Sequence, residues 1–121
     1  MRFEELDPRA TIASQLGDAD GPLVLLNVFT MEPGDAEGFL RAWTAESAFF
    51  REQPGYISTQ LHQGVGGSTM YVNYAVWESA AAFGAAFRKP EFKKTAAQFP
   101  ASVVALPHLV RKIAVPGYCV A

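Results

Sequence analysis

The stretch TMYVNYAVWES (residues 69–79) is the part of this chain that decides its fold class. It is rich in β-branched and aromatic residues and ends at a serine, a residue type that caps helices. It therefore predicts a strand that leads into a helix. Side chains alternate between the two faces of a strand, which places Tyr71, Asn73 and Trp77 on one face. A buried amide without a hydrogen bond costs about 1–3 kcal/mol, so Asn73 is either a structural hydrogen-bonding residue or part of a polar site in an apolar cavity.

The segments on either side of this strand extend the pattern to the order βαββαβ. The other strands are predicted at residues 23–30, 56–62 and 103–115, and the helices at residues 36–53 and from Ser79 to about Gln98, with an interruption at Pro90. The glycine-rich residues 64–67 are a hairpin loop and not a dinucleotide-binding loop, because they follow a strand but open no helix. This order predicts an α+β chain with the ferredoxin-like fold, in which helices cover one face of an antiparallel sheet.

The first part of the chain precedes this pattern. We expect residues 1–21 to form an N-terminal arm with a short helix, and residues 22–121 to form the ferredoxin-like domain. Asp7 followed by Pro8 predicts where the helix of the arm begins, and Gly17 predicts where it ends.

Both faces of the predicted sheet are apolar. An antiparallel sheet with one face in water would show polar residues on that face. Here, apolar residues also occupy the face opposite to Asn73, namely Val24, Leu26, Val28, Val72, Tyr74 and Val76. A second copy of the same sheet would cover this face, so we expect a symmetric homodimer.

The composition narrows the class of protein. Half of the residues are hydrophobic and 18% are charged, which suggests a subunit interface or an internal cavity. The net charge of −2 does not favour nucleic acid as a partner. No apolar run is long enough for a membrane span, no secretory signal is seen at residues 1–5, and Cys119 has no second cysteine to pair with. These features predict a cytoplasmic protein without a membrane partner.

A second amide, Asn27, lies in the middle of the apolar strand at residues 23–30. If this strand neighbours the one that holds Asn73, the two amides can share one face of the sheet. Both are then candidates for one site, although each remains open to a purely structural role as a buried hydrogen-bonding group.

The residues Val72-Asn73-Tyr74-Ala75-x-Trp77-Glu78-Ser79, with Pro54–Ser58 upstream, resemble the antibiotic biosynthesis monooxygenase family. Within it, the chain is most similar to the cofactor-independent anthrone oxygenases of aromatic polyketide pathways, over about residues 22–115. The resemblance implies a dimeric α/β barrel. It also implies that Asn73 and Trp77 line a substrate cavity between sheet and helices, and that molecular oxygen is the co-substrate, with no flavin, haem or metal.

From these arguments we expect Asn73, Trp77 and Asn27 to be catalytic. The expected substrate-binding residues are Tyr71, His62, Phe83, Phe87, Trp43 and Lys93. The resemblance puts Phe83 where the anthrone oxygenases have a tyrosine, and Lys93 near their later arginine. His62 matches one of their histidines. The expected function is oxidation of a phenolic or anthrone-type aromatic to a quinone.

Other functions fit parts of the chain less well. A non-catalytic dimeric binding module and a cyclase-like helper remain alternatives. Haem degradation is disfavoured, because the haem-ligating histidine and a tryptophan of such relatives would fall near Ala96 and Ala86. His62 and His108 lack the cysteine or carboxylate spacing of a metal site. The strand at 69–79 also lacks the glycine-and-aromatic motif of RNA-recognition modules.

Overall fold

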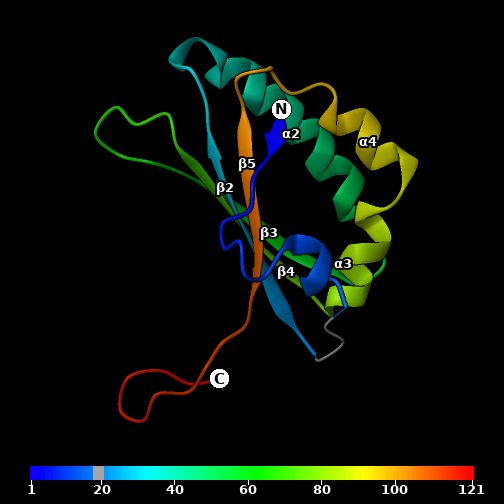
Figure 1. The fold of residues 1–121 in the computed structure, drawn as a ribbon, viewed down its shortest axis with the longest axis vertical. Coiled ribbons are helices and arrows are strands. Elements are labelled where there is room, and N and C mark those ends of the chain that lie inside the picture. Colours follow the sequence, from blue (N-terminus) through cyan, green and yellow to red (C-terminus); the bar gives the residue numbers. More distant parts are fainter. Residues whose placement is uncertain (18–20) are drawn as a thin grey trace.

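The structure of the protein, a computed structural model, describes residues 1–17 and 21–121. In this described part, five strands form one sheet and helices pack on one of its faces (Figure 1). The strands are β1 (Arg2–Phe3), β2 (Leu23–Thr30), β3 (Tyr56–Gln63), β4 (Tyr71–Trp77) and β5 (Val104–Val110). The helical elements are α1 (Ile12–Gln15), the 3-10 turn η1 (Pro33–Asp35), α2 (Ala36–Arg51), α3 (Ala80–Phe87) and α4 (Pro90–Ala96).

The predicted ferredoxin-like order is confirmed by β2, α2, β3, β4, α3–α4 and β5. The sheet order is β1-β5-β2-β4-β3, and β2 at the centre is antiparallel to both β4 and β5. The register places Asn27 directly opposite Asn73 on one side and Pro107 on the other. The two amides therefore lie side by side in the middle of the sheet.

The helices α3 and α4 begin at residues that suit the first turn of a helix. The Ser79 hydroxyl accepts a hydrogen bond from the backbone N–H of Ala82 at 3.1 Å, and so caps α3. Pro90 ends that helical run and occupies the first turn of α4, where a missing N–H costs nothing. The break at Pro90 is thus confirmed.

The prediction for the helix in the N-terminal arm was wrong in its start. A carboxylate oxygen of Asp7 accepts a hydrogen bond from the backbone N–H of Arg9 at 2.9 Å, which makes residues 7–10 a turn. The helix α1 begins at Ile12, and the Thr11 hydroxyl caps it by accepting from the N–H of Ser14.

The arm is tied to the sheet. The strand β1 pairs in parallel with β5, and the side-chain oxygen of Gln15 accepts a hydrogen bond from the backbone N–H of Leu109 at 2.6 Å. These contacts cover the outer edge of β5, which would otherwise present unpaired backbone groups. The predicted division between arm and domain at residue 21 stays a prediction, and residues 18–20 just before it lie outside the described part.

The last strand is shorter than predicted. It ends at Val110 rather than at residue 115, because Val110 pairs with Val24 and the neighbouring strand β2 begins one residue before that, at Leu23. Beyond this point, β5 has no partner strand among the described residues. Residues 111–121 are exposed and extend away from the sheet (Figure 1).

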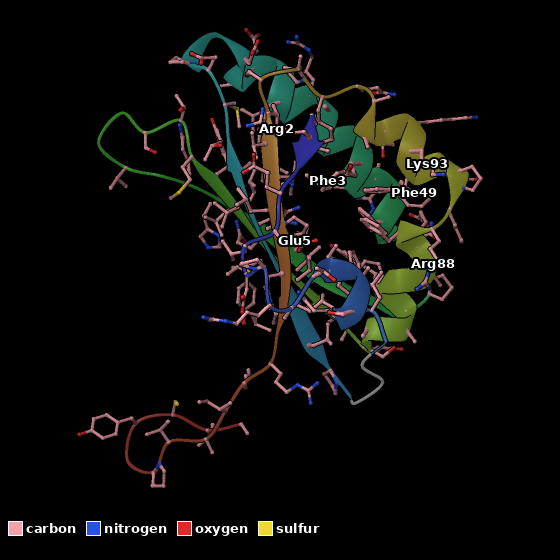
Figure 2. The ribbon with its side chains drawn as sticks, in the orientation of Figure 1. Arg2, Phe3, Glu5, Phe49, Arg88 and Lys93 are labelled. Atoms are coloured by element: carbon pink, nitrogen blue, oxygen red, sulfur yellow. The ribbon has the colours of Figure 1, made fainter. Side chains whose placement is uncertain are left out.

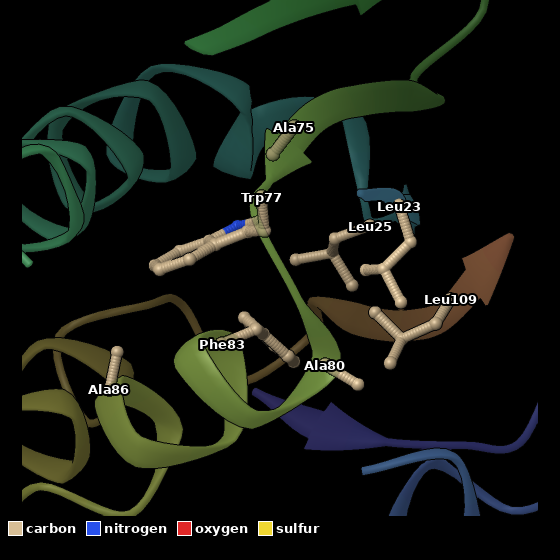
Figure 3. Packing of buried hydrophobic residues seen from close by; sticks show 8 residues of the cluster. All are labelled: Leu23, Leu25, Ala75, Trp77, Ala80, Phe83, Ala86 and Leu109. Atoms are coloured by element: carbon tan, nitrogen blue, oxygen red, sulfur yellow. The ribbon is translucent and has the colours of Figure 1, made fainter. Parts of the chain in front are cut away.

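The core lies between the sheet and the helices, in two clusters of buried side chains. One surrounds Trp77 and Phe83 (Figure 3). The other surrounds Phe29 and Phe39. No helix of the described residues covers the opposite face of the sheet, where Tyr74 remains 40% exposed. Within the described residues, no helix has the length and apolar character that a membrane span requires.

Candidate active site

A cavity lies between the helical face of the sheet and the helices α2, α3 and α4. Its walls are rich in aromatic residues, and all three helices contribute to them. These residues include Trp43 on α2, Phe83 and Phe87 on α3 and Phe92 on α4. The cavity is narrow, with a volume of about 30 Å³.

The sheet contributes two amides to this cavity. Asn27 and Asn73 both line it, as their cross-strand pairing requires. The Asn73 side-chain oxygen accepts a hydrogen bond from the Thr59 hydroxyl on β3 at 2.5 Å, which leaves the NH2 group to contact a ligand. Asn27 is 9% exposed, and its side-chain oxygen has no hydrogen-bond partner among the described residues. A buried acceptor without a donor costs free energy, so few such atoms occur in native structures.

The indole of Trp77 reaches from the end of β4 toward the helical layer (Figure 3). Three aromatic rings contact it edge-on, with centroid distances of 5.8 Å to Phe50, 5.7 Å to Tyr56 and 5.4 Å to Phe83. These contacts lock the position of the indole. Its N–H donates to none of the other described residues, so it is available to a ligand.

A buried carboxyl completes the polar part of the cavity. Glu46 on α2 is 8% exposed, and its Oε2 atom lacks a hydrogen-bond partner in the described structure. Burial raises the pKa of Glu46 from 4.5 to about 8, because a charged carboxylate loses its hydration in this apolar surrounding. The side-chain hydrogen bond with Thr95 on α4 lowers the pKa and so opposes burial only in part. Glu46 is therefore largely neutral at pH 7.

The structure brings most of the expected site residues together. Asn27, Asn73, Trp77, Trp43, Phe83 and Phe87 all line the cavity. Tyr71 is on the same face of β4 but lies farther along the strand, where its ring packs against Phe39 at 4.9 Å in the second core cluster. Tyr71 is thus a core residue and does not line the cavity.

His62 and Lys93 lie elsewhere, contrary to our expectation. A register shift between Tyr56 and Ser58 reverses the alternation of β3, so that Tyr56 and Thr59 face the cavity and His62 faces the other side of the sheet. His62 is exposed there, with its Nδ1 atom 3.3 Å from the carbonyl oxygen of Val72. Lys93 is exposed on α4 and borders a neighbouring hollow with Phe3 (Figure 2).

Glu46, Thr59 and Phe3 are among the cavity residues that sequence reasoning missed. Glu46 continues the helical spacing of Phe39, Trp43 and Phe50, and a carboxylate in that apolar stripe was the signal that would have found it. Thr59 had no such signal, because the shift in β3 decides which way it points. Phe3 enters the cavity wall from β1, at a sequence distance that no periodicity reveals (Figure 2).

The described residues hold no cluster of three or more histidine, cysteine, aspartate or glutamate side chains that is arranged to bind a metal ion. The polar groups that line the cavity are amides, hydroxyls and one neutral carboxyl. These groups bind and orient an organic ligand and move a proton, and they form no ready metal-ligand set.

Comparison with known proteins gives a consistent result. Residues 22–98 match the antibiotic biosynthesis monooxygenase family. The chain is 37% identical over 75 residues to the deoxynogalonate monooxygenase of Streptomyces nogalater, and this match spans 62% of each of the two chains. The arm at residues 1–21 lies outside the part that matches the family.

Solved structures show the same fold. The cofactor-independent oxygenase SnoaB of Streptomyces nogalater superposes with a TM-score of 0.73 at 26% identity, over 81% of this chain and 99% of that chain. A protein of Pseudomonas aeruginosa superposes with a TM-score of 0.63 at 24% identity, over 81% of this chain and all of its own, and this second likeness concerns the fold alone.

Proposed function

Since the chain belongs to the antibiotic biosynthesis monooxygenase family, we propose that it oxidises a phenolic or anthrone-type polyketide intermediate with molecular oxygen and without a cofactor. The product would be a quinone. The relatives support this reading, since one is described as a cofactor-independent oxygenase and another as a deoxynogalonate monooxygenase.

The observation that carries the proposal is the pair of amides in an aromatic cavity. Asn27 and Asn73 are paired on the adjacent strands β2 and β4, and Trp77 lines the same cavity. Flat aromatic walls suit a flat aromatic ligand. The donors from Asn73 and Trp77 are held by packing and by Thr59, so they stabilise an anion without reorganising during the reaction.

Such a substrate supplies its own electrons. Loss of a proton from the anthrone methylene gives a carbanion, which passes one electron to oxygen, and the radical pair recombines to form a C–O bond. Protonation of the resulting peroxide and loss of water leave the quinone carbonyl, so that one CH2 group and one O2 become one C=O group and one water. The enzyme binds the substrate, stabilises the anion and excludes bulk water from the peroxide.

We further propose that the protein acts as a homodimer through the face of the sheet that no helix covers. On that face Leu26, Val28 and Val72 are only half-buried, and Tyr74 is exposed. Contact between two such faces removes this apolar surface from water. It leaves the cavities on the outer, helical sides of the two subunits.

The direct test is oxygen uptake with anthrone as substrate, using metal-free protein purified without added cofactor. We expect one O2 consumed per anthraquinone formed, at a rate well above that of anthrone in buffer. The variant Trp77→Phe keeps most of the aromatic volume and removes the indole N–H. Loss of one such donor typically lowers kcat by about 10²–10³-fold.

Two outcomes would contradict the proposal. Binding of anthrone, seen as quenching of tryptophan fluorescence, without oxygen uptake would favour the non-catalytic binding module or cyclase-like helper. Oxygen uptake that appears only after flavin, haem or metal is added would show that the reaction needs a cofactor.

A further inference from the structure

Two residues that line the cavity each carry a buried oxygen atom without a hydrogen-bond donor among the described residues. These atoms are Oδ1 of Asn27 on β2 and Oε2 of Glu46 on α2, and both residues are more than nine-tenths buried. Burial removes the hydration of each atom, which costs free energy. A ligand that offsets this cost must bring donor hydrogens to these atoms.

Glu46 differs from the other titratable groups around the cavity. The Tyr56 phenol and the Met1 α-amino group also line it. The helix α4 packs against α2, and its charged residues Glu91, Lys93 and Lys94 are all exposed, while Arg88 is exposed after α3 (Figure 2). No salt bridge within the described part neutralises Glu46. Of the titratable groups described, Glu46 alone combines deep burial with an unpaired acceptor oxygen.

We propose that Glu46 is the catalytic base of the reaction: it accepts the proton that the aromatic substrate loses before oxygen reacts, and returns it to the peroxide. This role rests on the proposed oxygenase function and adds a residue to it. The carboxylate oxygen takes H⁺ from the methylene carbon, whose C–H electron pair becomes the carbanion. After the carbon has bonded to O2, the same proton moves from the carboxyl to the terminal peroxide oxygen, and Glu46 is regenerated.

The surroundings of Glu46 suit this task. A general base works best when its pKa is near the working pH, because it is then both available and basic enough. Burial, with only partial opposition from Thr95, holds the pKa of Glu46 at about 8. Proton transfer from substrate to Glu46 moves a negative charge from the carboxylate to the carbanion, so no net charge is created in the apolar cavity. Asn27 accepts a neighbouring phenolic hydrogen on the substrate.

Proton abstraction by Glu46 can be measured separately from the reaction with oxygen. In D2O under nitrogen, anthrone in the presence of the wild-type protein should exchange its methylene hydrogens faster than in buffer, as followed by proton NMR. Glu46→Gln should lower both this exchange and aerobic oxygen uptake by about 10²-fold or more. Glu37→Gln is the matched control, because Glu37 lies on the same helix but is exposed and paired with Arg41 at 3.6 Å. It should behave as wild type.

The dependence of the exchange rate on pH distinguishes a base from a structural residue, because a purely structural role of Glu46 would not change it. The wild-type exchange rate should rise with pH and level off above about pH 8, and this rising limb should be absent in Glu46→Gln. Glu46→Asp, which keeps a carboxylate on a shorter arm, should recover part of the rate together with the rising limb. This second variant also serves if Glu46→Gln does not fold.

Each result leads to a different conclusion. Exchange at the wild-type rate in folded Glu46→Gln, with normal oxygen uptake, would overturn the role of Glu46 and leave the oxygenase function intact. Glu46-dependent exchange without oxygen uptake would overturn the oxygenase function and keep Glu46 as a base. Wild-type protein that promotes neither step would overturn both.

Discussion

At the scale of single residues, the cavity is defined by polar groups that an ordinary core would not contain. Asn27, Asn73 and Glu46 line the cavity at positions where an apolar side chain would be buried without the cost of removing a polar group from water. The side-chain oxygen of Asn73 is satisfied by Thr59, whereas Oδ1 of Asn27 and Oε2 of Glu46 have no partner among the described residues. Such under-satisfied polar groups are typical of binding and catalytic sites, where the ligand supplies the missing partners.

Asn73→Ala should reduce activity more than stability. The Thr59 hydroxyl that loses its partner also lines the cavity, where water can replace the amide, so the free energy of unfolding should fall by no more than about 1 kcal/mol. Turnover and urea unfolding are measured on one preparation. Thr59→Val is the control, since it removes the same hydrogen bond but keeps the amide. A large loss of stability with turnover intact would make Asn73 a structural residue.

The pKa of Glu46 predicts how stability depends on pH. In the folded state this pKa is about 8, against 4.5 for an exposed glutamate, so the folded state binds the extra proton between these values. Glu46 therefore makes its full contribution to the free energy of unfolding below about pH 4.5. This contribution is lost as the pH rises to about 8, by at most about 1.4 kcal/mol per pH unit.

Glu46→Gln should remove this dependence. Wild type and variant should have similar unfolding free energies near pH 4.5, and the variant should become progressively the more stable of the two up to about pH 8. Urea unfolding at pH 5, 6, 7 and 8 measures the difference, in which the other carboxyl groups cancel. Parallel pH curves for the two proteins would show that Glu46 is ionised in the folded state.

At the scale of elements, the site depends on how the start of α3 meets the turn before β3. Gly55 has a φ of +87°, and its carbonyl oxygen accepts a hydrogen bond from the N–H of Glu78 at 2.8 Å. A Cβ atom on Gly55 would lie 2.4 Å from the Cβ of Ala82. This close approach fixes α3, and with it Phe83, against the end of β4 that holds Trp77.

Gly55→Ala should therefore be strongly destabilising. Gly66→Ala is its matched control, because Gly66 has a φ of +71° but open space around it. The control should lose about 1–2 kcal/mol from backbone strain alone. Gly55→Ala should lose a further 1–3 kcal/mol or so from overpacking. Urea unfolding compares the two, and equal losses would mean that α3 moves away from the turn at no cost.

At the scale of the whole molecule, the uncovered sheet face should decide the oligomeric state. Sedimentation at micromolar concentration should give about twice the 13.1 kDa chain mass. Tyr74→Lys should shift the protein toward monomer, because Tyr74 lies exposed at the centre of this face and a charge there opposes its burial. Val65→Lys in the hairpin loop is the control. Wild-type protein that sediments as a monomer would leave this apolar face in water and contradict the dimer.

The sequence by itself determined the order of elements and which side chains share a face within one strand or helix. Strand alternation and helical spacing are local properties, so residues 69–79 showed that Asn73 and Trp77 share a face, and Pro90 showed a break between two helices. Each of these statements needs only the residues within one element.

Only the tertiary structure decided what enters the cavity. The shift in β3 turned His62 out and Thr59 in, and the packing of α2 on the sheet turned Glu46 inward. The pairing of β1 with β5 brought Phe3 to the cavity wall, and the start of β2 at Leu23 set where β5 ends. These features depend on contacts between segments far apart in the chain, which local periodicity does not encode, because strand register and helix rotation are set by which surfaces meet.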